Sequence, residues 1–292
     1  MLFYLEKIQH TNLVPIGMGC FLLLVLSRYL DPFSKIRYYG NFAIFILHSS
    51  VLGALMIPYM LIFSFRKVSN CYRLGSPLIL PVSKLLGIKW ELRDEEYLKE
   101  QRPGVVVVNH QSMFDILGLF SVWPVMKDVA AVSKKELLFV FPFGFVAYLA
   151  GVIFISRLSK SSKSGQQTIE DAADQLFKDN GKLLIFPEGT RNKNPNKLLP
   201  FRKGAFRVAI KNQVPIYPLV YSPFYFIDME HKRFGFGKIT IKALEPIQTK
   251  GKTMEELDQV IQETHKVMSE AYNDLRQENP SKEAYFESLK TK

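Results

Sequence analysis

The feature that most constrains the fold is a run of four valines at positions 105–108. β-Branched side chains favour an extended backbone, and an apolar run without polar alternation is typical of a strand buried on both faces. Pro103 and Gly104 precede the run, and Asn109 and His110 follow it. The sequence therefore predicts a buried strand that ends in a polar pair.

Asp115 lies five residues after His110, and Ser112 and Asp115 have the S-x-x-D spacing of a helix capping box. On one continuous helix of about 3.6 residues per turn, His110 and Asp115 would point in different directions. A strand-turn-helix corner lets Asp115 reach back to one imidazole nitrogen, which fixes the tautomer and makes the other nitrogen a better general base. These residues alone leave open that Asp115 merely caps a helix beside a surface histidine.

Short β-rich runs alternate with helical stretches along the rest of the chain. We expect strands at residues 88–92, 105–109, 128–132, 152–155, 183–186 and 216–221, and helices at residues 168–179, 203–212 and 253–277. This alternation predicts an α/β fold with a mainly parallel sheet flanked by helices. Functional sites in such sheets lie where strands end and helices begin.

Two long apolar stretches, at residues 12–29 and 41–65, precede the α/β pattern. Each approaches the ~20 residues needed to cross a hydrocarbon core. The short connector predicts a helix hairpin that either spans the bilayer twice or enters one leaflet. We therefore expect a membrane-anchoring hairpin at residues 1–70, an α/β domain at residues 71–280 and a loose tail at residues 281–292.

Basic residues near the hairpin bear on its orientation, because they favour the cytosolic side of a membrane. Those after the second stretch are Arg66, Lys67 and Arg73, and those in the connector, which oppose them, are Arg28, Lys35 and Arg37. We expect the α/β domain to face the cytosol, with the hairpin in the endoplasmic reticulum membrane.

A third apolar run, at residues 137–150, contains Pro142 and Gly144. Crossing the membrane here would place His110 on one side and all later motifs on the other. We therefore expect a helix broken at Pro142 and Gly144 that lies on or partly in the membrane surface.

The formal net charge of +11 implies anionic partners, such as a membrane surface or a phosphorylated substrate. Lys and Arg are scattered and no nucleic-acid-binding motif is present, so we expect no nucleic-acid partner. Cys20 and Cys71 provide neither a disulfide framework nor a zinc-ligand set. His110, Asp115 and Glu188 lack the second imidazole of the usual facial triad, so we expect no metal.

Residues 186–191, Phe-Pro-Glu-Gly-Thr-Arg, follow an expected strand. They supply a carboxylate, a hydroxyl, a guanidinium and a glycine that permits close approach, a set that suits a phosphate. Arg157 and Lys134 also follow strands, so cations from three strand ends are expected beside His110 and Asp115. For the hexapeptide alone, a strand-end turn with a surface salt bridge remains an alternative.

Together these motifs resemble those of the glycerolipid acyltransferases, and most closely the 1-acyl-sn-glycerol-3-phosphate acyltransferases. The similar blocks are N-H-x-x-x-x-D at residues 109–115, G-x-x-F-I-x-R at 151–157, F-P-E-G-T-R at 186–191 and V-P-I-x-P at 214–218, in the family's order. Residues 203–206, Lys-Gly-Ala-Phe, also stand where relatives have them. Ser156 departs from the pattern, because close animal relatives usually have an acidic residue there.

The resemblance implies transfer of a fatty acyl group from acyl-CoA to the sn-2 hydroxyl of lysophosphatidate, giving phosphatidate for phospholipid and triacylglycerol synthesis. Acyl-CoA is then a co-substrate, and no tightly bound cofactor is implied. His110 would be the general base and Asp115 its orienting partner. The residues implied around the acceptor's phosphate and glycerol are Arg157, Glu188, Gly189, Thr190, Arg191 and Lys134.

Three alternatives remain from the sequence. The acceptor is another lysophospholipid, or the protein is a lipid hydrolase using the same histidine, or it is a non-catalytic membrane-binding protein. The last would not need both His110 and Asp115. No G-x-S-x-G motif is present and neither cysteine is near a motif, so an acyl-enzyme is not expected.

Overall fold

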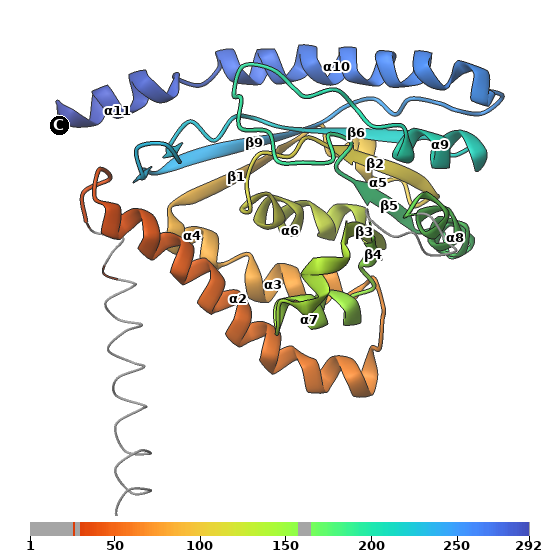
Figure 1. Ribbon diagram of the computed structural model, residues 1–292, viewed down its shortest axis with the longest axis horizontal. Coiled ribbons are helices and arrows are strands. Elements are labelled where there is room, and N and C mark those ends of the chain that lie inside the picture. Colours follow the sequence, from red (N-terminus) through yellow and green to blue (C-terminus); the bar gives the residue numbers. More distant parts are fainter. Residues whose placement is uncertain (1–25, 27–29, 157–164, 292) are drawn as a thin grey trace, which may run out of the picture.

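A computed structural model of the protein describes Leu26, residues 30–156 and residues 165–291. A seven-stranded sheet lies between two layers of helices, with strand order β1-β9-β6-β2-β5-β3-β4 (Figure 1). The strands are β1 (Ile88–Arg93), β2 (Gly104–Val108), β3 (Val129–Lys134), β4 (Ile153–Ile155), β5 (Lys182–Ile185), β6 (Ile216–Tyr221) and β9 (Gly237–Ala243). Strands β2 to β6 are parallel, and β9 pairs antiparallel with β6. The predicted fold class, a mainly parallel sheet flanked by helices, is confirmed.

Each of the expected strands is present, with ends shifted by at most two residues. Strand β9 was missed, although its Ile239, Ile241 and Ala243 alternate with lysine and threonine, a pattern that is itself typical of a strand. The hairpin of β7 (Ile227–Asp228) and β8 (Arg233–Phe234) was also missed, because two residues are too few to show a period.

Two groups of helices cover the sheet (Figure 1). On one side lie α2 (Lys35–Phe63), α3 (Ser76–Ile79), α4 (Val82–Leu86), α6 (Asp115–Met126) and α7 (Phe143–Leu149). On the other side lie α8 (Gly165–Lys178), α9 (Gly204–Lys211) and α10 (Leu257–Gln277). A capping box of Thr253 and Glu256 precedes α10.

The valine run of β2 joins both layers. Val106 and Val108 pack in the apolar core beneath α2 and α6, whereas Val105 and Val107 pack in the core beneath α8, α9 and α10. All four are fully buried. The alternation of side chains across a strand explains why one run supplies both cores, as predicted.

Helix α2 belongs to the same packed unit as the sheet. Tyr38, Ile44, Phe45, Met56 and Met60 are buried in the core that contains two of the β2 valines. The predicted boundary at residue 70 therefore divides a continuous core. Among the described residues, α2 alone is long and apolar enough to cross a membrane, with a mean hydropathy of 1.8 in its most apolar window. Apart from Leu26, the first expected hairpin helix lies outside the described residues.

The third apolar run forms two short elements, the 3-10 helix η3 (Lys135–Phe139) and the seven-residue helix α7. Gly144 is the second residue of α7 and packs against η3, because a Cβ there would be 2.1 Å from the carbonyl oxygen of Leu137. The glycine thus permits a turn too tight for a side chain. The expected break at Pro142 is present, whereas Gly144 lies within α7, and the position of this run at the membrane surface stays a prediction.

The expectation of a loose C-terminal tail is wrong, because α11 (Lys282–Lys290) forms there. The Ser281 hydroxyl accepts a hydrogen bond from the Ala284 N–H group and caps this helix. Phe286 is buried, and its ring packs against Phe33, with centroids 5.8 Å apart. This burial gives the tail an apolar anchor.

Candidate active site

The corner between β2 and α6 brings His110 and Asp115 together, as predicted. Asp115 is the first residue of α6, and its Oδ2 lies 2.7 Å from His110 Nδ1. The backbone N–H groups of Gln111 and Ser112 donate to the same oxygen, at 2.7 and 3.0 Å. Asp115 is 1% exposed and the imidazole is 24% exposed. The carboxylate is therefore held by the backbone, and it orients a partly accessible imidazole.

Both interpretations of Asp115 hold, because one oxygen performs both roles. Asp115 caps the turn by accepting the Ser112 N–H group, while the Ser112 hydroxyl accepts from the Phe114 N–H group at 3.2 Å. Only half of the predicted capping box is thus formed. The same Oδ2 fixes His110 Nδ1, so capping and imidazole orientation are coupled.

The imidazole ring is also held by stacking. The Phe186 ring lies 4.2 Å from it, centroid to centroid, with an interplanar angle of 22°. Because Asp115 occupies Nδ1, the Nδ1–H tautomer leaves Nε2 as the nitrogen that can accept a proton. This arrangement favours a general base.

Two residues that we did not predict fasten the corner to β6. The Asn109 side chain donates to the Tyr221 carbonyl at 3.1 Å and accepts from the Tyr221 N–H group at 2.8 Å. The Tyr221 hydroxyl donates to the Asp115 carbonyl at 3.2 Å. The sequence carried little sign of this role, since a tyrosine in an apolar strand usually indicates core packing.

Glu188 joins the hexapeptide to the corner between β2 and α6. Its Oε1 accepts the His110 N–H group and its Oε2 accepts the Leu199 N–H group, both at 2.8 Å. Burial raises the pKa of the Glu188 carboxyl, and these backbone hydrogen bonds offset only part of the rise. The Asn192 N–H group donates to the His110 carbonyl at 2.6 Å. Glu188 therefore supports the site by holding the backbone of His110 in place.

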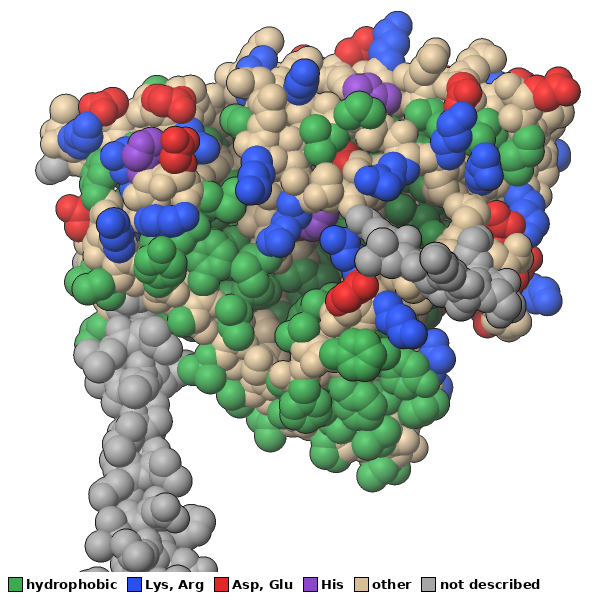
Figure 2. Space-filling model, in the orientation of Figure 1, with side chains coloured by type: hydrophobic (Ala, Val, Ile, Leu, Met, Phe, Trp, Pro, Cys, Tyr) green, Lys and Arg blue, Asp and Glu red, His purple; other side chains and the backbone are tan. Residues whose placement is uncertain are grey.

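The ends of several strands surround one cavity of about 1210 Å³. Figure 2 shows Lys and Arg side chains gathered around a recess above the apolar lower lobe. The predicted residues that line the cavity are His110, Asp115, Lys134, Gly189, Thr190 and Arg191, and Ser156 lines it too. Arg157 lies outside the described residues, so its role stays a prediction.

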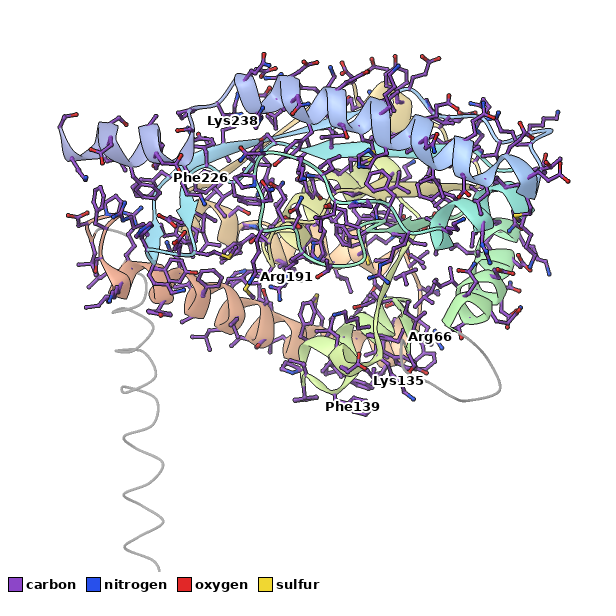
Figure 3. All side chains as sticks on the ribbon, turned by 45° about the horizontal axis from the view of Figure 1, so that its top comes forward. Arg66, Lys135, Phe139, Arg191, Phe226 and Lys238 are labelled. Carbon is purple, nitrogen blue, oxygen red and sulfur yellow. The ribbon has the colours of Figure 1, made fainter. Side chains whose placement is uncertain are left out.

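The cavity has a cationic part and an apolar part. Arg191 and Lys134 are exposed, and neither forms an ion pair with any residue that the structure describes. Arg191, labelled in Figure 3, belongs to the loop that follows β5. The apolar wall, contributed by α2, α6 and α7, includes Phe45, Met56, Met60, Ile116, Leu119 and Val146.

Arg202 is a further cation of the cavity, and the sequence reasoning missed it. Its side chain lies against Gly189, where a Cβ would be 2.4 Å from Arg202 Nε. A signal was present, since Arg202 directly precedes the Lys-Gly-Ala-Phe block at 203–206. This signal did not indicate whether Arg202 or Lys203 faces the cavity.

Comparison with known proteins decides the family. Residues 89–222 match the family described as Acyltransferase. The human 1-acyl-sn-glycerol-3-phosphate acyltransferase beta is 36% identical over 248 residues, which cover 85% of each chain. The chain belongs to the 1-acyl-sn-glycerol-3-phosphate acyltransferase family. The predicted family and its enzymatic nature are thereby confirmed.

Two further similarities agree with this acyltransferase assignment. The human alpha form is 34% identical over 226 residues, covering 77% of this chain and 75% of the relative. A crystal structure of the 1-acyl-sn-glycerophosphate acyltransferase PlsC from Thermotoga maritima has the same fold, with a TM-score of 0.62 and 22% identity. The match covers 87% of this acyltransferase and 95% of the PlsC chain.

Proposed function

We propose that this acyltransferase moves a fatty acyl group from acyl-CoA to the sn-2 hydroxyl of lysophosphatidate, giving phosphatidate and free CoA. The observation that carries the proposal is the position of the His110–Asp115 pair in a cavity with an apolar wall and with cations that pair with no acidic residue in the described part of the chain. An acceptor with a phosphate, a hydroxyl and a hydrocarbon chain matches these features. The names of the human relatives support the same acceptor.

The pair is suited to direct transfer. His110 Nε2 takes the hydroxyl proton as the acceptor oxygen attacks the thioester carbonyl, and Asp115 stabilises the imidazolium that forms. When the tetrahedral intermediate collapses, the C–S bond breaks and the imidazolium returns the proton to the departing CoA sulfur. The ester bond replaces the thioester bond, and His110 returns to its neutral form.

Cys71 lines the cavity but is poorly suited to act as a nucleophile. Burial raises the pKa of its thiol to about 12. The thiolate, which is the reactive form, is therefore scarce near neutral pH. Direct transfer without a covalent acyl-enzyme agrees with this environment.

The surface around the cavity is suited to a membrane. The side of α2 that faces away from the sheet exposes Ile36, Tyr39, Val51, Leu55, Tyr59 and Ile62. Phe139, the last residue of η3, and Phe141, two residues later, are 75% and 74% exposed. Figure 3 shows Phe139, Lys135 and Arg66 in the same lower region, a combination that fits an apolar interior beneath anionic head groups.

We therefore propose that α2 and residues 137–150 lie in one leaflet, which keeps the cavity open to lipid. Packing of α2 along the domain supports this over a helix that crosses alone. Arg66 and Lys67 follow α2, so the proposed side is the cytosolic face of the endoplasmic reticulum, where phospholipid and triacylglycerol synthesis would use the product.

The decisive experiment is transfer of a labelled acyl group from acyl-CoA to a panel of lysolipids, using the membrane-bound protein. We expect labelled phosphatidate to form from lysophosphatidate. Release of free fatty acid regardless of acceptor would identify a hydrolase instead. Transfer only to another lysophospholipid would assign a different head group.

A labelling experiment tests the membrane arrangement. Cysteines are placed singly at Lys127 and Lys193 after Cys20 and Cys71 are replaced by alanine. Because these positions flank residues 137–150, an impermeant maleimide should label both from the same side of sealed microsomes. Labelling from opposite sides in an active variant would refute the arrangement.

A further inference from the structure

The glycine of the Phe-Pro-Glu-Gly-Thr-Arg motif makes room for an arginine. Gly189 has φ +69°, and a Cβ there would lie 2.4 Å from Arg202 Nε and 2.6 Å from Arg202 Cδ. The backbone N–H group of Arg202 donates to the Pro187 carbonyl at 2.8 Å, which holds the two backbone segments together. The Arg202 side chain is therefore held against the motif backbone, in space that any other residue at position 189 would occupy.

Arg202 and its neighbour Lys203 have opposite environments. Arg202 lines the cavity and forms no ion pair with any residue in the described part of the chain. Lys203 does not line the cavity, and its ammonium group lies 2.7 Å from the Asp258 carboxylate. An arginine presents several N–H donors in a planar fork that matches a phosphate. Of these two adjacent cations, Arg202 is the one available to a bound anion.

The position of Arg202 relative to His110 indicates whether Arg202 suits the phosphate of lysophosphatidate or the phosphates of acyl-CoA. Arg202 packs against Gly189. The residue before Gly189 is Glu188, whose carboxylate accepts the backbone N–H group of His110 at 2.8 Å. In lysophosphatidate, two carbons and one oxygen separate the reactive hydroxyl oxygen from phosphorus. In acyl-CoA, the phosphates lie beyond the whole pantetheine arm from the reacting thioester. A cation that packs against the residue after Glu188, and that lines the same cavity as His110, fits the phosphate of the acceptor.

We propose that Arg202 binds the phosphate of the acceptor together with Arg191, and thereby sets the preference for phosphorylated over unphosphorylated acceptors. This inference rests on the proposed function and adds a specificity-determining residue to it. Gly189 acts in the same arrangement, because its missing side chain seats Arg202.

The test compares Arg202→Ala, Arg202→Lys and Arg191→Ala with the matched control Lys203→Ala. Kinetics are measured with lysophosphatidate and with monoacylglycerol as acceptors, and with acyl-CoA as donor. Loss of a charge-assisted hydrogen bond corresponds to roughly a 10- to 100-fold change. Arg202→Ala should lower kcat/KM for lysophosphatidate by about this factor, mainly through the acceptor KM.

The preference for lysophosphatidate over monoacylglycerol should fall by a similar factor, because monoacylglycerol has no phosphate for Arg202 to bind. The KM for acyl-CoA should stay unchanged. Arg202→Lys should recover part of the loss, since lysine keeps the charge without the planar fork. Lys203→Ala should behave as the wild type.

An unchanged KM for lysophosphatidate in Arg202→Ala would overturn the proposal. A rise only in the KM for acyl-CoA would overturn it too. Thermal unfolding shows whether each variant is folded. If Arg202→Ala is not folded, the acceptor selectivity of Arg202→Lys tests the proposal instead. Failure of the proposed function is a separate outcome, because the wild type would then form no phosphatidate. A wild type that forms phosphatidate beside an unaffected Arg202→Ala refutes this inference alone.

Discussion

The described residues include two His–Asp pairs with the same short contact. His110 Nδ1 lies 2.7 Å from Asp115 Oδ2, and His231 Nδ1 lies 2.7 Å from Asp228 Oδ2. Both carboxylates are buried, and both accept backbone N–H groups from their own turn. At this level of detail the β2–α6 corner and the β7–β8 turn are equivalent.

Their surroundings differ. The His110 imidazole is stacked on Phe186 and opens into the cavity, whereas His231 is 57% exposed and does not line the cavity. Burial tends to raise the pKa of Asp228, but hydrogen bonds from the His231 backbone and imidazole outweigh it, and the pKa is lowered. The second pair thus stabilises a turn. We infer that a His–Asp contact can serve catalysis only where its free nitrogen opens into a cavity that also contains suitable charges.

The largest expected effect separates the two histidines. His110→Ala should reduce acyl transfer by about 10²- to 10⁴-fold, because the general base is lost. His231→Ala, the matched control, should leave the rate unchanged. Both are measured as initial rates in membranes that contain equal amounts of folded protein. Similar losses in both variants would show that the two pairs do not differ as described.

A smaller effect is expected from the carboxylates. Asp115→Asn keeps an acceptor oxygen but removes the charge that stabilises the imidazolium, so kcat should fall by about 10- to 100-fold. Asp228→Asn should leave kcat unchanged, although it should lower the melting temperature. An unaffected kcat in Asp115→Asn would remove the orienting role from this residue.

The smallest effect concerns Glu188, which supports only the first pair. Glu188→Gln places an NH₂ group opposite a backbone N–H group, which should cost about 1–3 kcal/mol of unfolding free energy. Glu270→Gln, at an exposed position on α10, is the control and should cost little. Chemical denaturation of the detergent-solubilised protein measures both.

The pH dependence of this stability has a defined sign. Because the pKa of Glu188 is raised in the folded state, the folded protein binds more protons than the unfolded chain between the ordinary value of 4.5 and the raised value. The contribution of Glu188 to stability should therefore fall as pH rises through that window. The stability difference between the wild type and Glu188→Gln should shrink accordingly. A difference that grows with pH would contradict the raised pKa.

Much of the catalytic corner could be predicted from the sequence because it is local. The valine run, the turn and the first residue of α6 lie within a short stretch whose backbone preferences act on near neighbours. The contacts that fasten the corner could not be predicted in the same way. Asn109 bonds to Tyr221, and Gly189 packs against Arg202, across long separations in the sequence.

By itself, the sequence determined the strands of the parallel sheet, the His110–Asp115 corner and the motif that ends in Arg191. These depend on side-chain branching, alternation and spacing, which are properties of neighbouring residues. The tertiary structure decided that α2 shares the core of the sheet, that Arg202 rather than Lys203 faces the cavity, and that His110 rather than His231 opens into it. These outcomes depend on which surfaces distant segments bury against one another. A local sequence pattern does not determine this burial.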